Sequence, residues 1–178
     1  AAGVDQVLFD VVGDEATIHE VLHLDRSPAD YEAALAMLRR MELPVAPHVV
    51  VGLHFGQLRG ELTALDIIHR VGADVVVIVV LRPLPHTPMA ETPVVAAQTV
   101  GRLAAVARLL NPRTPLTLGC ARPSGAVKLE MERRAVLAGV NAVAYPDPAT
   151  VSLAGELGLH TSFVESCCTL AAPPAPSP

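Results

Sequence analysis

The sequence predicts an α/β fold, a partial (β/α) barrel built on a parallel sheet. Five short apolar segments recur along the chain, and segments with helical spacing of apolar residues separate them. Polar residues follow nearly every apolar segment. A strand and helix succession at this spacing is typical of a parallel sheet. Hydrophobic residues make up 51% of the chain and aromatic residues only 3%, as expected of buried strands rich in Val, Ala and Leu.

The predicted strands are the most apolar segments. They are Gln6 to Val12, His48 to Leu53, Asp74 to Leu81, Pro115 to Cys120 and Asn141 to Pro146. The longest purely apolar run, Val75 to Leu81, is far too short to span a bilayer, so no membrane role is expected.

The clearest predicted helix covers residues 31–40, where apolar residues at i, i+3, i+4 and i+7 form one face. Ser27, Pro28 and Asp30 match an N-cap, a first-turn proline and a capping-box acid. The same apolar spacing and the expected C-cap glycines recur at Val100 to Ala107, Met131 to Ala138, Gly72 and Gly139.

A barrel competes with an open doubly wound sheet. The first strand–helix turn lacks G-x-G-x-x-G and the chain lacks G-x-x-x-x-G-K-[ST], which weakens nucleotide-binding folds. Barrel sites are assembled at the carboxyl ends of many strands. Polar residues stand at these ends: Asp10, Asp14, Glu15, His54, Gln57, Arg82, His86, Thr87, Cys120, Arg122, Tyr145 and Asp147. Because five strands cannot close an eight-stranded barrel, further strands are expected upstream.

Composition narrows the class of protein. A formal net charge of −5 gives no basic footprint for nucleic acid. Three cysteines, two of them adjacent, argue against a disulfide framework, so a reducing, cytoplasmic compartment is expected. Residues 1–170 are expected to form the barrel portion, and the proline-rich residues 171–178 a disordered tail.

Five segments, in order, resemble the carboxyl-terminal portion of radical S-adenosylmethionine (SAM) enzymes of the biotin synthase group. The likeness is greatest to the biotin synthase-related proteins that include the two-component lipoyl synthases. It runs from about Gly3 to Leu170. The segments are FDVVGDEATIHEVLHLDRSPADYE, PHVVVGLHFGQLRGE, VVVLRPLPHTPM, LGCARPSG and AVLAGVNAVAYP. The five strands would be the fourth to eighth of the family barrel.

The resemblance implies SAM and a [4Fe–4S] cluster as cofactors. Together they would generate a 5′-deoxyadenosyl radical that abstracts hydrogen, with sulfur insertion into a small-molecule or lipoyl-type substrate. A second radical SAM subunit and an electron donor are the implied partners. The C-x-x-x-C-x-x-C cluster motif is absent from these residues. It is therefore expected upstream, and this part alone is expected to be inactive.

The resemblance also implies a SAM site. Val51, Gly52 and Leu53 would line the adenine, Asp10 would bind the ribose hydroxyls, and Arg26 would pair with the SAM carboxylate. The alternatives are ordinary ones. The glycine-bearing segment would only make a βα turn, Asp10 would be a solvated acid or helix cap, and Arg26 a surface ion-pair residue.

Further residues are substrate-side candidates. Arg82 and His86 lie where relatives commonly read P-x-x-G-T-P, with His86 in place of the glycine. Arg122 lies beside the position of an arginine ligand to an auxiliary cluster in biotin synthases.

The cysteines are candidate ligands of an auxiliary iron–sulfur cluster. Cys120 ends the fourth predicted strand, and Cys167 and Cys168 follow a short apolar run. Three thiolates from two segments can hold such a cluster. The alternative is that they pack as small apolar side chains.

Two other functions stay open. A cluster-free barrel lyase or isomerase is one, although the only lysine, Lys128, lies in a predicted helix rather than at a strand end. A non-catalytic half-barrel subunit that completes a partner through its sheet edges is the other.

Overall fold

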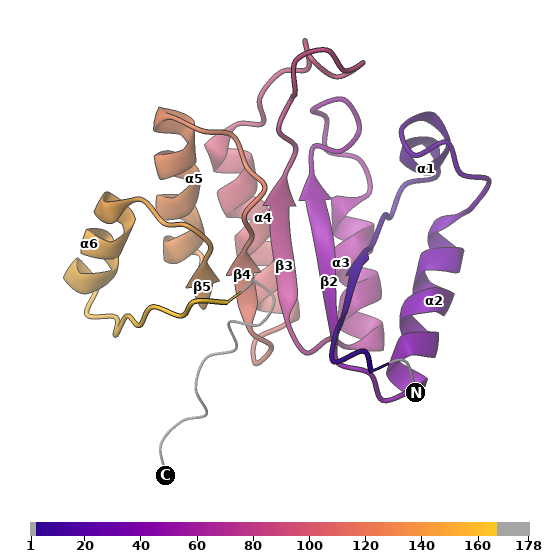
Figure 1. Ribbon diagram of the computed structural model, residues 1–178, viewed down its shortest axis with the longest axis horizontal. Helices are drawn as coiled ribbons and strands as arrows, with labels where there is room; N and C mark the ends of the chain where they lie inside the picture. Colours follow the sequence, from indigo (N-terminus) through magenta and orange to yellow (C-terminus); the bar gives the residue numbers. More distant parts are fainter. Residues whose placement is uncertain (1–2, 167–178) are drawn as a thin grey trace.

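The fold is a five-stranded parallel sheet flanked by helices (Figure 1). A computed structural model describes residues 3–166. The strands are β1 (Val7–Asp10), β2 (Val45–Val51), β3 (Val76–Val80), β4 (Leu116–Leu118) and β5 (Ala142–Val143). The helices are α1 (Glu15–Glu20), α2 (Pro28–Arg40), α3 (Glu61–Val71), α4 (Ala97–Leu110), α5 (Ala126–Leu137) and α6 (Pro148–Glu156).

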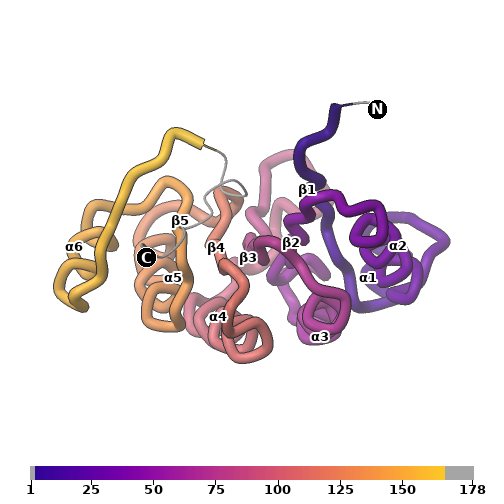
Figure 2. Tube along the Cα trace, turned by 90° about the horizontal axis from the view of Figure 1, so that it is seen from below, coloured from indigo at the N-terminus to yellow at the C-terminus, as the bar shows by residue number. Residues whose placement is uncertain are grey.

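The strand order confirms the predicted fold class. The strands pair in sequence order, β1-β2-β3-β4-β5, and every pairing is parallel. A doubly wound sheet would reverse its order at a switch point. Figure 2 shows the strands on an arc with α2, α3, α4 and α5 along its outer side. The arrangement is that of a (β/α) barrel segment, with its inner face turned away from the helices.

The core lies between the sheet and the helices. One face of each strand, including Val49, Ile78 and Leu118, packs against apolar residues of α3 and α4 such as Leu65 and Val100. Full burial of each such side chain contributes about 1.5–3 kcal/mol. A second, smaller cluster gathers Ala46, Val75, Val77 and Val79. Both faces of β3 are therefore buried, which explains the unbroken apolar run that encodes it.

The predicted elements exist, but some bounds differ. β2 begins at Val45, three residues earlier than predicted, and passes through Pro47. Pro47 lies in register with Phe9, and the ladder to β3 starts only at His48. At the start of α2 the predicted capping box is present, since Ser27 N donates to Asp30 Oδ2 at 2.8 Å.

Two short helices were not predicted, α1 and α6. Each starts at an aspartate N-cap: Asp14 accepts from Thr17 N at 2.8 Å, and Asp147 accepts from Ala149 N at 2.9 Å. This is the usual way to satisfy a first-turn donor. Within residues 3–166, none of the helices is long and apolar enough to cross a membrane.

Candidate functional site

The carboxyl ends of the strands gather most of the polar residues predicted to act. Because β1 and β2 run parallel, Asp10 and Leu53 lie at the same end of the sheet, the one with the carboxyl ends of the strands. Asp10 is exposed, and its carboxylate forms no ion pair or hydrogen bond within the described chain. Leu53 is half-buried. This end of the sheet therefore carries an exposed carboxylate, which acts electrostatically on Tyr31, and a partly exposed apolar side chain.

A hydrogen-bonded network joins α1 to the turn after β2. Thr17 Oγ1 lies 2.7 Å from Asp14 Oδ2 and 3.3 Å from His54 Nδ1. The single hydroxyl proton of Thr17 is donated to the carboxylate, so the Thr17 oxygen must accept from His54 Nδ1–H. Nδ1 of His54 therefore carries a proton in this network, and Nε2 is directed away from Thr17.

Charged side chains surround this network. Arg59 Nη1 lies 3.5 Å from His54 Nε2, and Arg59 Nε lies 3.4 Å from Asp14 Oδ2. Glu20 Oε2 lies 3.9 Å from the same His54 nitrogen. Partial burial opposes ionisation of Asp14, but the Thr17 donors and the Arg59 charge outweigh it and lower its pKa. Asp14 is therefore ionised, and its contacts with Thr17 and Arg59 hold α1 against the turn after β2.

The backbone of the β2–α3 turn is held by Glu61. Gly52 N donates to Glu61 Oε1 at 2.8 Å, and Gly52 O accepts from Gly56 N at 2.8 Å. A Cβ on Gly52 would lie 2.4 Å from Val95 Cγ2, so glycine is required here by the segment that precedes α4. Burial raises the pKa of Glu61, and the Gly52 N–H only partly offsets it.

The predicted adenine-lining residues differ in what they offer a ligand. Val51 is buried toward the helices, and its carbonyl accepts from Leu81 N at 2.9 Å. Both backbone polar groups of Gly52 are bonded internally. Val51 and Gly52 can therefore offer only apolar contact, whereas Leu53 presents a partly exposed side chain. Among the three, Leu53 is the residue whose side chain a ligand could contact.

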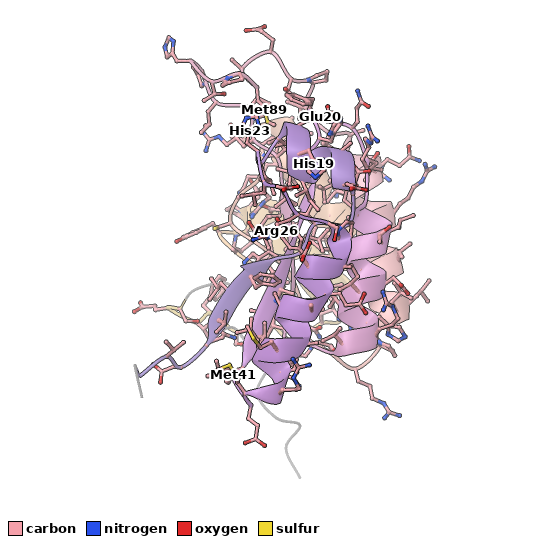
Figure 3. The ribbon with its side chains drawn as sticks, turned by 90° about the vertical axis from the view of Figure 1, so that its right-hand side faces the viewer. His19, Glu20, His23, Arg26, Met41 and Met89 are labelled. Atoms are coloured by element: carbon pink, nitrogen blue, oxygen red, sulfur yellow. The ribbon has the colours of Figure 1, made fainter. Side chains whose placement is uncertain are left out.

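Arg26 lies between α1 and α2, below His19 and Glu20 (Figure 3). Its side chain is exposed, and Nη1 donates to the carbonyl of Asp25 at 2.9 Å. His19 Nε2 donates to the Arg26 carbonyl at 3.1 Å and fixes the backbone there. Within residues 3–166 the guanidinium forms no salt bridge with a carboxylate, which suits it to a ligand carboxylate.

Neither of two cavities in the described chain is lined by all of these residues. A small cavity at the strand ends is lined by Val11, Leu53 and Glu61, among others, but not by Asp10 or Arg26. A larger cavity of about 490 Å³ lies on the helical side, between α3 and α4. Asp10 and Arg26 do not line it either. Neither cavity brings Asp10, Arg26 and the end of β2 together, and their assignment to one SAM site stays a prediction.

Arg82 and His86 belong to the long segment that follows β3. Both are exposed. His86 has a positive φ of 63°, the conformation that the glycine of the related motif would adopt freely. Thr87 Oγ1 donates to the Leu84 carbonyl at 2.8 Å and tightens the turn. Their assignment to the substrate side stays a prediction.

The environment of Arg122 corrects its predicted role. Arg122 is buried, and its guanidinium bonds Glu132 Oε1 at 2.6 Å and the Gly119 carbonyl at 2.5 Å. It also donates to the carbonyls of Ala144 and Tyr145. These contacts tie the ends of β4 and β5 to α5. Its guanidinium is thus committed to the fold rather than presented to a substrate.

Glu132 is the residue that sequence reasoning missed. It is fully buried and accepts from Arg122, Lys128, Asp147 N and Thr150. Burial opposes its ionisation, but these donors prevail and lower its pKa. The sequence signal was weak, because Glu132 lies in a charged helical stretch and only its i,i+4 spacing to Lys128 marks it.

The thiol of Cys120 is exposed at the end of β4. Cys167 and Cys168 lie outside the described residues, so the predicted auxiliary cluster stays a prediction. Among residues 3–166, no group of three or more His, Cys, Asp or Glu side chains is placed to bind a metal ion.

Comparison with known proteins identifies the fold only. No family model matches the sequence, and no curated protein matches it. Among solved structures, HMG-CoA lyase from Brucella melitensis aligns over 89% of this chain with a TM-score of 0.58 and 12% identity. The alignment covers 61% of the lyase chain. At this identity the likeness supports a shared β/α architecture, of which this chain spans a little under two thirds.

Proposed function

We propose that this chain is the carboxyl-terminal part of a radical SAM barrel and contributes one wall of a SAM site. The observation that carries the proposal is the pair of charges at the carboxyl edge that form no salt bridge in the described chain, the carboxylate of Asp10 and the guanidinium of Arg26. The resemblance of the ordered sequence segments gives the family. The sequential half-barrel gives a frame in which strand ends from both halves would face one ligand.

The roles of the residues follow from their chemistry. The Asp10 carboxylate accepts hydrogen bonds from the two ribose hydroxyls, and the Arg26 fork pairs with the methionyl carboxylate. Leu53 lies against the adenine. SAM and a reduced iron–sulfur cluster would supply the radical chemistry, which belongs to the cofactors. The Asp14–Thr17–His54 network keeps α1, and with it the segment after Asp10, in place.

The proposal is tested on the full-length protein. We expect wild type to bind SAM in equilibrium dialysis and to form 5′-deoxyadenosine under reducing conditions. Asp10→Asn and Arg26→Gln should each weaken SAM binding about 10- to 100-fold, because a hydrogen bond to a charged group contributes about 1.5–3 kcal/mol. Asp5→Asn and Arg113→Gln, which change exposed residues elsewhere, are the matched controls and should bind as wild type does.

A wild-type protein that does not bind SAM would refute the proposal, and unchanged affinity in both variants would refute the assignment of the residues. A barrel lyase is the second candidate, favoured by the likeness to HMG-CoA lyase. Consumption of HMG-CoA by the same protein, without SAM, would support it.

A further inference from the structure

Tyr145 has an unusual backbone at the carboxyl edge of the sheet. It follows β5 and has a φ of 48°. This left-handed conformation crowds the Cβ of every residue except glycine. Positive φ occurs at eight glycines and at five other described residues, namely His23, Glu42, Phe55, His86 and Tyr145. Tyr145 and Phe55 are bulky side chains in this conformation, and a bulky residue there is an outlier that suggests a structural or functional constraint.

The Arg122–Glu132 ion pair holds this backbone in place. Arg122 Nη2 donates to the Tyr145 carbonyl at 3.2 Å. On the other side of the turn, Glu132 Oε2 accepts from Asp147 N at 2.8 Å and from Thr150 Oγ1 at 2.7 Å. One buried ion pair therefore anchors the turn before and after Tyr145, so the backbone cannot relax without breaking it.

The side chain that this arrangement presents does nothing for the described fold. Tyr145 is 81% exposed, and its hydroxyl has no hydrogen bond within residues 3–166. The residue lies at the strand ends, where barrel sites are built. Backbone strain that the fold does not need clusters at functional sites. The exposed ring, on a backbone that the buried ion pair holds in place, is available to a partner outside the described chain.

We infer that Tyr145 contacts the organic substrate at the mouth of the barrel. Its ring offers a flat apolar face and its phenol a hydrogen bond. Arg122, which holds the Tyr145 carbonyl, is itself paired with Glu132 and is therefore not available to a charged group of the substrate. β5 and β1 are the two edge strands of the sheet, so Tyr145 lies away from Asp10, the proposed SAM residue. The inference rests on the proposed function for the identity of the reaction.

The test compares Tyr145→Gly and Tyr145→Phe with Glu42→Gly in the full-length protein. Glu42 is exposed and has a φ of 57°, but it lies between α2 and β2, at the amino edge. Both glycine variants relieve the same backbone crowding, so both should raise Tm to a similar extent. Only Tyr145→Gly should lower kcat/KM, at least tenfold, with the SAM dissociation constant within twofold of wild type. The probe is an octanoyl-lysyl peptide, the acyl group of a lipoyl chain without its two sulfurs.

Each outcome decides the inference. Tyr145→Phe keeps the ring and should lose only the part of the effect that the hydroxyl contributes. A Tyr145→Gly protein with raised Tm and unchanged kcat/KM would overturn it, and so would a lowered Tm, since the ring would then be packing within the protein. If wild type neither binds SAM nor acts on the probe, the proposed function fails. Even then, the change in Tm of Tyr145→Gly, compared with that of Glu42→Gly, shows whether the backbone conformation of Tyr145 destabilises the fold.

Discussion

At the scale of single residues, two buried glutamates show how donors decide the charge of a carboxyl group. Glu132 and Glu61 are both almost inaccessible to solvent. Glu132 accepts from two cations, a hydroxyl and a backbone N–H, and its pKa is lowered although burial opposes this. Glu61 is held by backbone N–H groups alone, and burial raises its pKa. One glutamate is therefore kept charged, and the other resists ionisation.

This difference predicts opposite pH dependences. The usual pKa of a glutamate is 4.5, and the pKa of folded Glu61 is higher. At pH values between these two, Glu61 is deprotonated in the unfolded chain but still protonated in the folded chain. The stability contributed by neutral Glu61 is thus complete in acid and lost as pH rises, at about 1.4 kcal/mol for each pH unit between the unfolded and folded pKa values. Glu61→Gln, whose amide oxygen can still accept from Gly52 N, should become more stable relative to wild type from pH 4 to pH 7.

Denaturant unfolding at a series of pH values measures this difference. Glu132→Gln is the control with the opposite sign. Because the folded pKa of Glu132 is lowered, its stabilisation is present above pH 4.5 and lost as pH falls through the folded value. A constant difference in unfolding free energy between Glu61→Gln and wild type at all pH values would contradict the assignment.

At the scale of elements, the turns after β1 and β2 are coupled by backbone contact. A Cβ on Gly60, where φ is 86°, would lie 2.5 Å from Asp14 N and 2.6 Å from the carbonyl carbon of Gly13. The N-cap of α1 therefore rests directly on the start of α3. No side chain at position 60 could be accommodated without separating the two turns.

We accordingly expect Gly60→Ala to be more destabilising than a glycine substitution with the same backbone strain alone. Gly72 has a φ of 90°, but a Cβ at this position would meet no atom of the described chain within 4 Å. Gly72→Ala should cost about 1–2 kcal/mol for its conformation. Gly60→Ala should cost about 1–3 kcal/mol more for the overlap. Equal losses in thermal and denaturant unfolding would show that the turns are not in rigid contact.

At the scale of the whole molecule, the sheet has two strands with one neighbour each. Within residues 3–166, β1 pairs only with β2, and β5 only with β4. Leu8 on β1 is 53% exposed. An unpaired apolar edge is a template for pairing with another chain. In the proposed barrel these edges would be covered by the remaining strands.

The protein made from these 178 residues alone should therefore associate in a concentration-dependent manner. Leu8→Lys should reduce this association, because a charge at a strand edge opposes strand addition. Leu109→Lys, at a residue of α4 that is 79% exposed, is the matched control and should have little effect. Light scattering over a range of concentrations measures both, and equal effects of the two substitutions would assign the association to general surface hydrophobicity.

The sequence allowed the sheet to be predicted better than the site. Apolar runs locate strands because burial on both faces demands them, as at β3. The predicted start of β2 was too late because a proline usually marks the limit of a strand. Pro47 nevertheless pairs in register with Phe9 of β1, and the ladder to β3 begins only after it, at His48. Arg122, beside a proline, reads as an exposed loop residue. Its partner Glu132 is ten residues away on a helix, and such pairings depend on packing that periodicity does not encode.

The sequential strand order also bears on how the molecule opens. Each strand bonds only to its neighbours, and β3 is buried along its whole length between β2 and β4. Amide protons in β3 can exchange with solvent only when several units separate, whereas those of β1 and β5 are released by opening a single edge. The chain is thus a series of cooperative units whose local free energy of opening decreases from the centre outward. A partner that completes the sheet would therefore pair first with β1 or β5, the strands that open most readily.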